Sequence, residues 1–289
     1  MTFLIPLEHH VADTDRAEAA KILGCSEEAL DAFIHSGLTV RDGRFDSRDL
    51  FNIGLHSGTG RTMPEQAFAF ALRWMRSPTE ELVARRVSRF SFGLTCSCAR
   101  ASLARPRTDL YSGEVRDLTA TATNVTATIS TTGAAAPVRS RTLVSLLRDF
   151  HGLGLRWVKL PDALRRKEEL VTSHRVATCD SASRHLARQC RAAGIPATTR
   201  IGWVVGMLDL VHAWVEVTDE DGVTKVVDPI FALFAGTLPD ANPVLTDPTV
   251  AFRTNRLIPT DLPVGGRVAQ HACASPATVK IQQLKEMPS

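Results

Sequence analysis

The stretch from Thr178 to Pro229 reads TCDSASRHLARQCRAAGIPATTRIGWVVGMLDLVHAWVEVTDEDGVTKVVDP. It places three reactive residues in order: Cys179 at the start of a predicted helix, then His212 and Asp228 on successive predicted strands. A thiol nucleophile, a histidine base and a carboxylate that orients the base form one catalytic unit in cysteine enzymes. The order of residue types therefore predicts nucleophilic catalysis through Cys179.

A helix is predicted to begin at Cys179, because apolar residues recur at helical spacing up to Cys190 and Gly194-Ile195-Pro196 then ends the pattern. Thr178 is of the residue type that caps a helix N-terminus. Free N–H groups and the positive end of the helix dipole favour thiolate over thiol at this position. The same N–H groups can receive the oxyanion that forms after attack.

The histidine and the aspartate lie on a predicted hairpin. Residues 211–217 (VHAWVEV) alternate, so His212, Trp214 and Glu216 share one face of a strand, and TDEDGVT then turns the chain into Lys225 to Asp228. An antiparallel partner brings Asp228 beside the His212 strand, where a carboxylate would fix the imidazole tautomer. Each residue alone also fits a structural role in the core or a turn, but their joint order favours catalysis.

These blocks resemble a known family. A cysteine opening a helix, followed by RAAGIPATTRIGW, HAWVEV and VVDP, resembles the core of the transglutaminase-like superfamily over about residues 141–235. The resemblance implies an α+β, papain-like core in which the helix carrying Cys179 packs on an antiparallel sheet carrying His212 and Asp228. It also implies a thioester acyl-enzyme, made from an amide or ester donor and released to an amine or water.

The sequence departs from that family around the cysteine. Ala177 stands where many members have Gly, and Asp180 stands where many have Trp. A carboxylate beside the thiolate opposes its ionisation but suits a helix N-terminus, so we expect lower thiol reactivity or selection of a cationic substrate. With Trp214 and Glu216, Asp180 is our expected substrate-binding residue. Trp157 is a candidate oxyanion partner by residue type, with a core aromatic as the alternative.

The N-terminal part is expected to be a helical module over residues 1–100. Residues 16–50 resemble the winged helix of excisionases and MerR-type regulators, with a stop at Gly24, a cap at Ser26 and a tight turn at Asp42-Gly43. The face that would meet DNA carries three acidic residues, Glu27, Glu28 and Asp31, which is a poor footprint for phosphates. We expect a docking or structural role and no nucleic-acid partner.

The rest of the chain is divided by composition and by turn residues. Residues 78–92 are expected to form an amphipathic helix, and residues 101–140 a linker or irregular segment, although the Thr/Ala alternation there also fits an exposed strand. The catalytic domain is expected over residues 141–260, and a poorly organised C-terminal tail over residues 261–289.

Composition limits the other function classes. The 289 residues are 44% hydrophobic with a formal net charge of +3, which gives no strong field for nucleic acid or membrane. No signal peptide or membrane span is predicted, so a cytoplasmic location is expected. The six cysteines are expected to be thiols. Cys96 and Cys98 form a CxC, but no second CxC or nearby His pair completes a metal site, and we expect no metal or cofactor.

The first hypothesis is a transglutaminase-like acyltransferase that forms an amide bond, in bacterial specialised metabolism, between a carrier-bound or peptide acyl donor and an amine. The alternative is a cysteine peptidase or amidase with the same three residues. A second alternative is a DNA-linked regulator whose transglutaminase-like domain is degenerate. The sequence does not identify the substrates or the oligomeric state.

Overall fold

The computed structural model describes residues 3–95, 98, 102–205, 211–273 and 277–283. Contacts divide the chain into two compact units, each made of two separate stretches. Unit 1 comprises Met1–Trp74 with Leu153–Ser181, and unit 2 comprises Met75–Gly152 with Ala182–Ser289. Helices and mostly antiparallel sheets form them, which confirms the α+β class. Within the described ranges, no helix has the length and apolar character needed to cross a bilayer.

Unit 1 is mainly helical. Gly24 ends the first helix with a φ of 64°, and the Ser26 side chain accepts a hydrogen bond from Ala29 N, which caps the second helix as predicted. An isolated bridge pairs Arg41 with Arg44 across the Asp42-Gly43 turn. The elements are η1 (Leu7–His9), α1 (Arg16–Leu23), α2 (Glu27–His35), α3 (Ser47–Leu55), α4 (Met63–Ala71), β6 (Arg156–Trp157), α7 (Glu169–Ser173) and β7 (Val176–Ala177).

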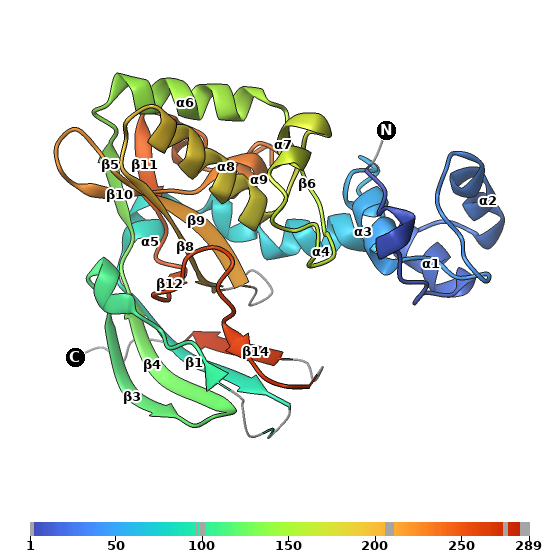
Figure 1. Cartoon of the computed structure of the whole chain (residues 1–289), viewed down its shortest axis with the longest axis horizontal. Helices are drawn as coiled ribbons and strands as arrows, with labels where there is room; N and C mark the ends of the chain where they lie inside the picture. Colours follow the sequence, from blue (N-terminus) through green and yellow to red (C-terminus); the bar gives the residue numbers. More distant parts are fainter. Residues whose placement is uncertain (1–2, 96–97, 99–101, 206–210, 274–276, 284–289) are drawn as a thin grey trace. The chain divides into compact units, whose positions relative to one another are not determined.

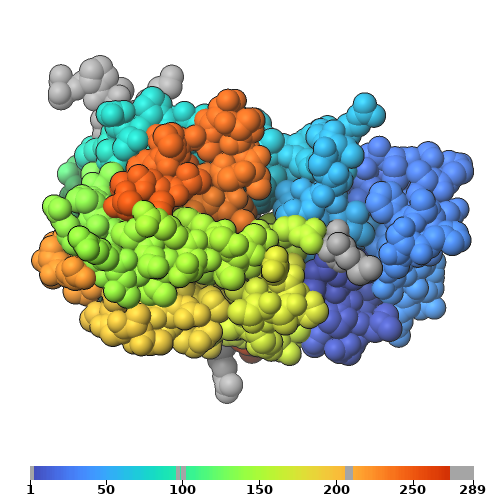
Figure 2. All heavy atoms as spheres, turned by 90° about the horizontal axis from the view of Figure 1, so that it is seen from above, coloured from blue at the N-terminus to red at the C-terminus, as the bar shows by residue number. Residues whose placement is uncertain are grey.

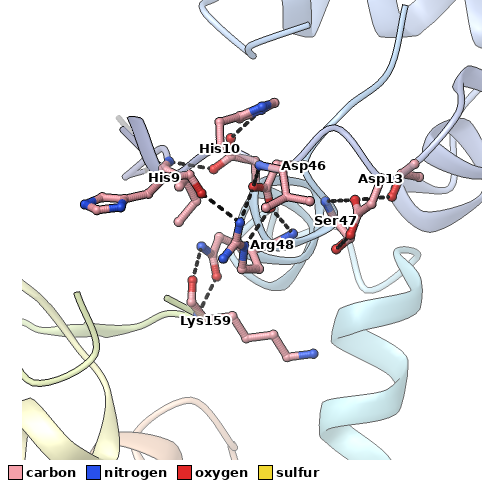
Figure 3. Close-up of polar contacts among 12 residues, drawn as sticks. His9, His10, Asp13, Asp46, Ser47, Arg48 and Lys159 are labelled. Atoms are coloured by element: carbon pink, nitrogen blue, oxygen red, sulfur yellow. Dashed lines mark hydrogen bonds and ion pairs between the residues drawn. The ribbon is translucent and has the colours of Figure 1, made fainter. Parts of the chain in front are cut away.

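Polar contacts at the start of α3 hold unit 1 together (Figure 3). Asp46 caps α3 by accepting from Arg48 N, and its carboxylate also pairs with the Arg48 guanidinium at 2.6 Å. Arg48 donates in addition to His9 O at 3.0 Å. Asn52 exchanges two hydrogen bonds with the backbone of Lys159, at 2.7 and 3.0 Å. The second stretch of unit 1 is therefore tied to the first through a side chain of α3.

Unit 2 contains two four-stranded sheets (Figure 1). One has the order β14-β1-β4-β3 and the other β10-β9-β8-β12. The strands are β1 (Arg86–Leu94), β2 (Ser102–Leu103), β3 (Glu114–Ala120), β4 (Asn124–Thr131), β5 (Ala134–Pro137), β8 (Ala197–Val204), β9 (Val211–Thr218), β10 (Thr224–Val227), β11 (Val250–Arg253), β12 (Leu257–Pro259), β13 (Ala269–Gln270) and β14 (Ala277–Gln283). The helices are α5 (Thr79–Val83), η3 (Thr108–Tyr111), α6 (Arg141–Gly152), α8 (Cys179–Ala192), α9 (Pro229–Ala235) and η4 (Pro243–Leu245); α8 begins in unit 1.

The core of unit 2 joins the two sheets. Trp203 on β8 is fully buried, and its ring lies 4.9 Å from that of Phe90 and 5.4 Å from that of Phe92, both on β1. Val125, Ala127 and Ile129 of β4 belong to the same cluster. Trp203 is therefore a core residue of unit 2.

Helices cover the sheet that carries β9. Figure 2 shows α6 at the surface of unit 2 with residues of α8 beside it, and the Phe150 ring of α6 lies 6.1 Å from that of His185 on α8. Helix α6 buries Leu143, Leu147 and Phe150.

The prediction of one helix over residues 78–92 is wrong. The chain forms the short helix α5 and then strand β1, in which Ser88, Phe90, Phe92 and Leu94 are buried in alternation. This period of two is the pattern of a strand with one face in the core. The sequence-based prediction of a helix treated the arginines at positions 85, 86 and 89 as its solvent-exposed face.

Two segments expected to be irregular contribute strands. Residues 114–137 form β3, β4 and β5, and β4 buries Val125, Ala127 and Ile129 in alternation, so the strand alternative for residues 101–140 holds there. In the C-terminal segment, β14 pairs antiparallel with β1, from Ser88–Gln283 to Leu94–Ala277. The many small Thr and Ala side chains of residues 114–137 gave too weak a hydrophobic signal to place those strands from the sequence.

Candidate active site

The start of α8 is built by a reciprocal cap. The Thr178 hydroxyl accepts from Ser181 N at 3.2 Å, and Thr178 N donates to the Ser181 hydroxyl at 3.0 Å. Two backbone N–H groups at this helix start are thereby satisfied. The predicted cap at Thr178 is confirmed, and α8 begins at Cys179 as expected.

Two cysteines on α8 have different environments. Cys179 is half-buried, whereas Cys190 is buried, and burial raises the pKa of the Cys190 thiol to about 11. A buried thiol with a raised pKa is a poor nucleophile at neutral pH. Cys190 therefore offers an internal reference for the reactivity of Cys179.

The carboxylate that follows Cys179 has a cationic neighbour. A guanidinium nitrogen of Arg165 lies 3.6 Å from Asp180 Oδ2, and the Asp180 side chain is 15% exposed. Pairing with Arg165 offsets part of the negative charge that Asp180 brings to the helix start. The role of Asp180 in substrate selection stays a prediction.

The predicted hairpin is observed. Strands β9 and β10 pair antiparallel, with Val227 opposite Val215 and Thr224 opposite Thr218. The turn is closed by Asp219 N donating to Val223 O at 3.1 Å. Asp228 directly follows β10 and His212 lies near the start of β9, so the hairpin brings the two side chains together.

His212 and Asp228 form a close pair. His212 Nε2 lies 2.6 Å from Asp228 Oδ2, and the two side chains are only 2% and 3% exposed. The second oxygen, Oδ1, accepts from Ile230 N and Phe231 N at 3.0 Å each and caps helix α9. A carboxylate held by the cap is fixed in direction, so it favours a proton on Nε2 and leaves Nδ1 as the basic nitrogen.

Aromatic rings hold the imidazole from its faces. The Phe231 ring is stacked on that of His212 at 4.8 Å with an interplanar angle of 10°, and the Trp214 ring lies 6.1 Å away. A ring packed in this way has little freedom to rotate. The sequence showed no sign of Phe231, because its contact depends on helix α9 turning back over β9.

Trp214 and Glu216, the other expected substrate-binding residues, belong to a buried network. Trp214 Nε1 donates to the Tyr111 hydroxyl at 2.6 Å, and that hydroxyl donates to Glu216. Two nitrogens of the Arg200 guanidinium donate hydrogen bonds to the Glu216 carboxylate, at 2.5 and 2.7 Å. Burial and the nearby carboxylate raise the pKa of Tyr111. These contacts give both residues a structural role on the strand that carries His212, and a role in binding substrate stays a prediction.

Trp157, the candidate oxyanion partner, packs among aromatic rings of unit 1. Its ring is stacked with that of Phe68 at 5.4 Å and meets that of Phe51 edge-on at 6.1 Å. Its carbonyl lies 2.7 Å from His56 Nε2. These contacts are those of a core aromatic residue, the alternative that the sequence left open.

No protein-family model matches the sequence, and no curated protein matches it significantly. Solved structures with a similar fold include a TGase, 16% identical, with a TM-score of 0.28 over 32% of this chain and 27% of the TGase. A protein of Cytophaga hutchinsonii, provisionally assigned as a cysteine protease, is 12% identical with a TM-score of 0.36 over 71% of this chain and 90% of its own. A provisionally assigned protease of Parabacteroides distasonis is 12% identical, with a TM-score of 0.24 over 51% and 41%.

The chain thus spans little more than a quarter of the TGase. The roles of individual residues rest on the contacts described above. Fold and contacts together define an α+β protein with a buried His–Asp pair and a half-buried cysteine at a helix start.

Proposed function

We propose that the chain is a transglutaminase-like cysteine acyltransferase in which Cys179, His212 and Asp228 form the catalytic triad. The observation that carries the proposal is the His212–Asp228 pair at 2.6 Å, with the carboxylate locked by the cap of α9. Such a pair supplies an oriented base, which is the component that a thiol at a helix start needs. The proposal requires the Cys179 thiol to come within reach of His212 Nδ1.

In the first half-reaction, Nδ1 of His212 takes the thiol proton and Cys179 Sγ attacks the carbonyl carbon of the acyl donor. N–H groups at the start of α8 would receive the oxyanion. The tetrahedral intermediate then collapses: the bond to the leaving group breaks, and His212 returns the proton to that group. The product is a thioester on Cys179 and a released amine, alcohol or thiol.

In the second half-reaction, an amine attacks the thioester while His212 accepts its proton. Collapse of the second intermediate forms the amide bond and returns the thiolate, which recovers the proton from His212. The Asp228 carboxylate stabilises the imidazolium in both steps. A carrier-bound or peptide acyl donor fits this scheme, since a thioester and an amide both present an acyl carbon with a leaving group.

The contacts of unit 1 argue against the regulator hypothesis. If the module bound DNA, Arg41, Arg44 and Arg48 would be its phosphate contacts, but Arg48 pairs with Asp46 at 2.6 Å and Arg44 donates to Asp13 O at 2.7 Å. On the acidic face of α2, Arg16 pairs with Asp31 at 2.7 Å. Cations already engaged by protein groups release few counterions from DNA, so a docking role is the better proposal for this module.

Intact-protein mass after incubation with acyl donors tests the proposal. A panel of activated esters and acyl thioesters should add one acyl group at Cys179, and the adduct should vanish in Cys179→Ser. It should persist longer in His212→Ala and Asp228→Asn, because release also needs the base. Absence of any adduct at Cys179 across donor types, in folded protein, would contradict the mechanism.

Alkylation provides a matched control on the same helix. Iodoacetamide should modify Cys179 much faster than the buried Cys190, as followed by peptide mass. His212→Ala should slow modification of Cys179 at neutral pH and leave Cys190 unchanged. Equal rates for the two thiols would mean that Cys179 is not activated.

The acceptor distinguishes transfer from hydrolysis. Trapped acyl-enzyme should release amide product when amines are added, at a rate that rises with amine concentration. Release at the same rate with and without amines would replace the acyltransferase by the peptidase or amidase alternative.

A further inference from the structure

A cysteine–histidine cluster lies in unit 2 and is made of residues outside the proposed triad. The side chains of Cys98, His271 and Cys273 bring one sulfur, one nitrogen and one further sulfur within 4.8 Å of one another. Among the described residues, this is the group of three whose ligand atoms can share a metal ion. Cys96, which completes the CxC, lies outside the described residues.

The strand register explains how residues so distant in sequence meet. Strand β2 pairs with β13, with Ser102 opposite Gln270, and β1 pairs with β14, with Leu94 opposite Ala277. Strands β2 and β13 form a separate two-stranded sheet, so the chain from β1 to β2 and the chain from β13 to β14 both connect that sheet with the four-stranded sheet of β1 and β14, in opposite directions. Cys98 lies in the first connection, and His271 and Cys273 lie in the second.

One ligand distance fits a tetrahedral metal, and all three ligand atoms lie within 4.8 Å of one another. His271 Nδ1 lies 3.4 Å from Cys273 Sγ. Ligands at the usual Zn–S and Zn–N lengths on a tetrahedral ion are about 3.5 Å apart for a sulfur–nitrogen pair and about 3.8 Å for two sulfurs. The backbone N–H of Ala272 donates to Cys98 Sγ at 3.4 Å, which links Cys98 to the segment that carries His271 and Cys273.

We propose that Cys98, His271 and Cys273 bind a zinc ion. Two thiolates and an imidazole are soft-to-borderline donors that favour zinc over magnesium or calcium. Binding replaces two thiol protons with the metal, and these protons pass to the buffer. The three residues fill three positions of a tetrahedral ion, and the ion would join the β1–β2 connection to the β13–β14 connection, apart from the residues of the proposed triad.

Cobalt(II) is the probe, because it occupies zinc sites and its bonds to thiolates absorb in the near ultraviolet. Full-length protein, reduced and stripped with chelator, should gain this absorption up to one equivalent of cobalt, and zinc should then displace it. Metal analysis of protein purified without chelator should give close to one zinc per chain. The melting temperature should fall on chelation and recover with zinc.

Variants locate the site. Cys98→Ser and Cys273→Ser should each lose most of the thiolate absorption, and His271→Ala should keep part of it but weaken binding about tenfold or more. The control is Cys25→Ser, which removes a thiol elsewhere in the chain and should bind as the parent does. Circular dichroism of each stripped variant checks that the fold is kept.

Three results would overturn the zinc site. One is wild-type protein that shows no thiolate–cobalt absorption while its thiols are reduced. Another is absorption that persists when Cys98 and Cys273 are both replaced by serine. The third is a Cys98–Cys273 disulfide in the isolated protein together with no metal binding after reduction.

Discussion

His212 Nε2 lies 2.6 Å from Asp228 Oδ2, while the other oxygen of the same carboxylate accepts two backbone N–H groups at the start of α9. The aspartate is thus both the partner of the histidine and the cap of a helix whose Phe231 ring is stacked on that histidine. It cannot turn away from His212 without uncapping α9. The orientation of the base is therefore coupled to the stability of one helix.

Two substitutions at Asp228 should separate these roles. In Asp228→Asn a side-chain oxygen can still cap α9, so we expect near-parental stability with acyl transfer reduced by about 100-fold or more, because the imidazolium loses its counter-charge. In Asp228→Ala the cap is lost as well, which should cost about 1 kcal/mol more in unfolding free energy. Urea unfolding and single-turnover rates measure the two effects. Full activity in Asp228→Asn would remove Asp228 from the mechanism.

Gly202 faces His212 across the β8–β9 pair, and its lack of a side chain is required. A Cβ there would lie 2.1 Å from Ile258 O and 2.8 Å from a ring carbon of Trp214. The backbone of Ile258 can move away only at a large cost in free energy. Gly202→Ala should therefore lower the unfolding free energy by about 3 kcal/mol or prevent folding of the sheet. Gly152→Ala is the matched control, since a Cβ there meets no atom within 4 Å. Equal urea midpoints for the two variants would contradict this packing.

The Arg200–Glu216 pair should be structural. Glu216→Gln leaves a half-buried guanidinium without its counter-charge and should cost about 3 kcal/mol, whereas Arg200→Lys, which keeps the charge, should cost less. If Glu216 instead contacts substrate, Glu216→Gln should raise KM while the unfolding free energy stays near the parental value. The comparison of KM with urea stability therefore decides between the two roles.

Stability should fall with rising pH because of Asp49. Burial, together with the charge of Asp46, raises the pKa of Asp49 to about 7 from an ordinary 3.8. The folded state then holds this proton more tightly than the unfolded chain, so the contribution is full below pH 3.8 and is lost as pH rises through 7. Between pH 5 and 8 the loss should be about 2.5 kcal/mol.

Asp49→Asn removes this titration and keeps an oxygen that can accept from Ile5 N, as Asp49 does at 2.7 Å. The unfolding free energy of the parent should therefore fall toward that of Asp49→Asn as pH rises. At higher pH the variant should be the more stable of the two proteins. Parallel pH profiles for the two proteins would show that Asp49 titrates normally.

Local signals in the sequence predicted much of the candidate site. The cap at Thr178 and the hairpin from His212 to Asp228 depend on residues within a few positions of each other, or within one hairpin, and the structure has both. The alternation of β9 also placed Trp214 and Glu216 on the face of His212. What lies against that face, Tyr111 and Arg200, comes from other strands and loops and leaves no local pattern.

The misses have the same cause. In residues 86–94 the buried side chains follow a period of two, but the arginines in this segment also fit a helical face. The segment is a strand because it pairs with β4, which is distant in the sequence. Cys98 precedes His271 by 173 residues and Cys273 by 175, and their side chains meet because the strands that flank them pair, β1 with β14 and β2 with β13. The HAC motif at residues 271–273 was the only local signal of a metal site in this segment. The sheet order was needed to show that Cys98 lies beside it.

The most direct test of the triad is a cross-link between Cys179 and His212. A short bifunctional alkylating agent, 1,3-dibromoacetone, first modifies the reactive thiol and then reaches only a nucleophile next to it. Peptide mass analysis should find Cys179 joined to His212, with the link lost in His212→Ala and unaffected in Cys190→Ala. Modification of Cys179 with no link to His212, in folded and reduced protein, would contradict the proposal that these residues act as one catalytic unit.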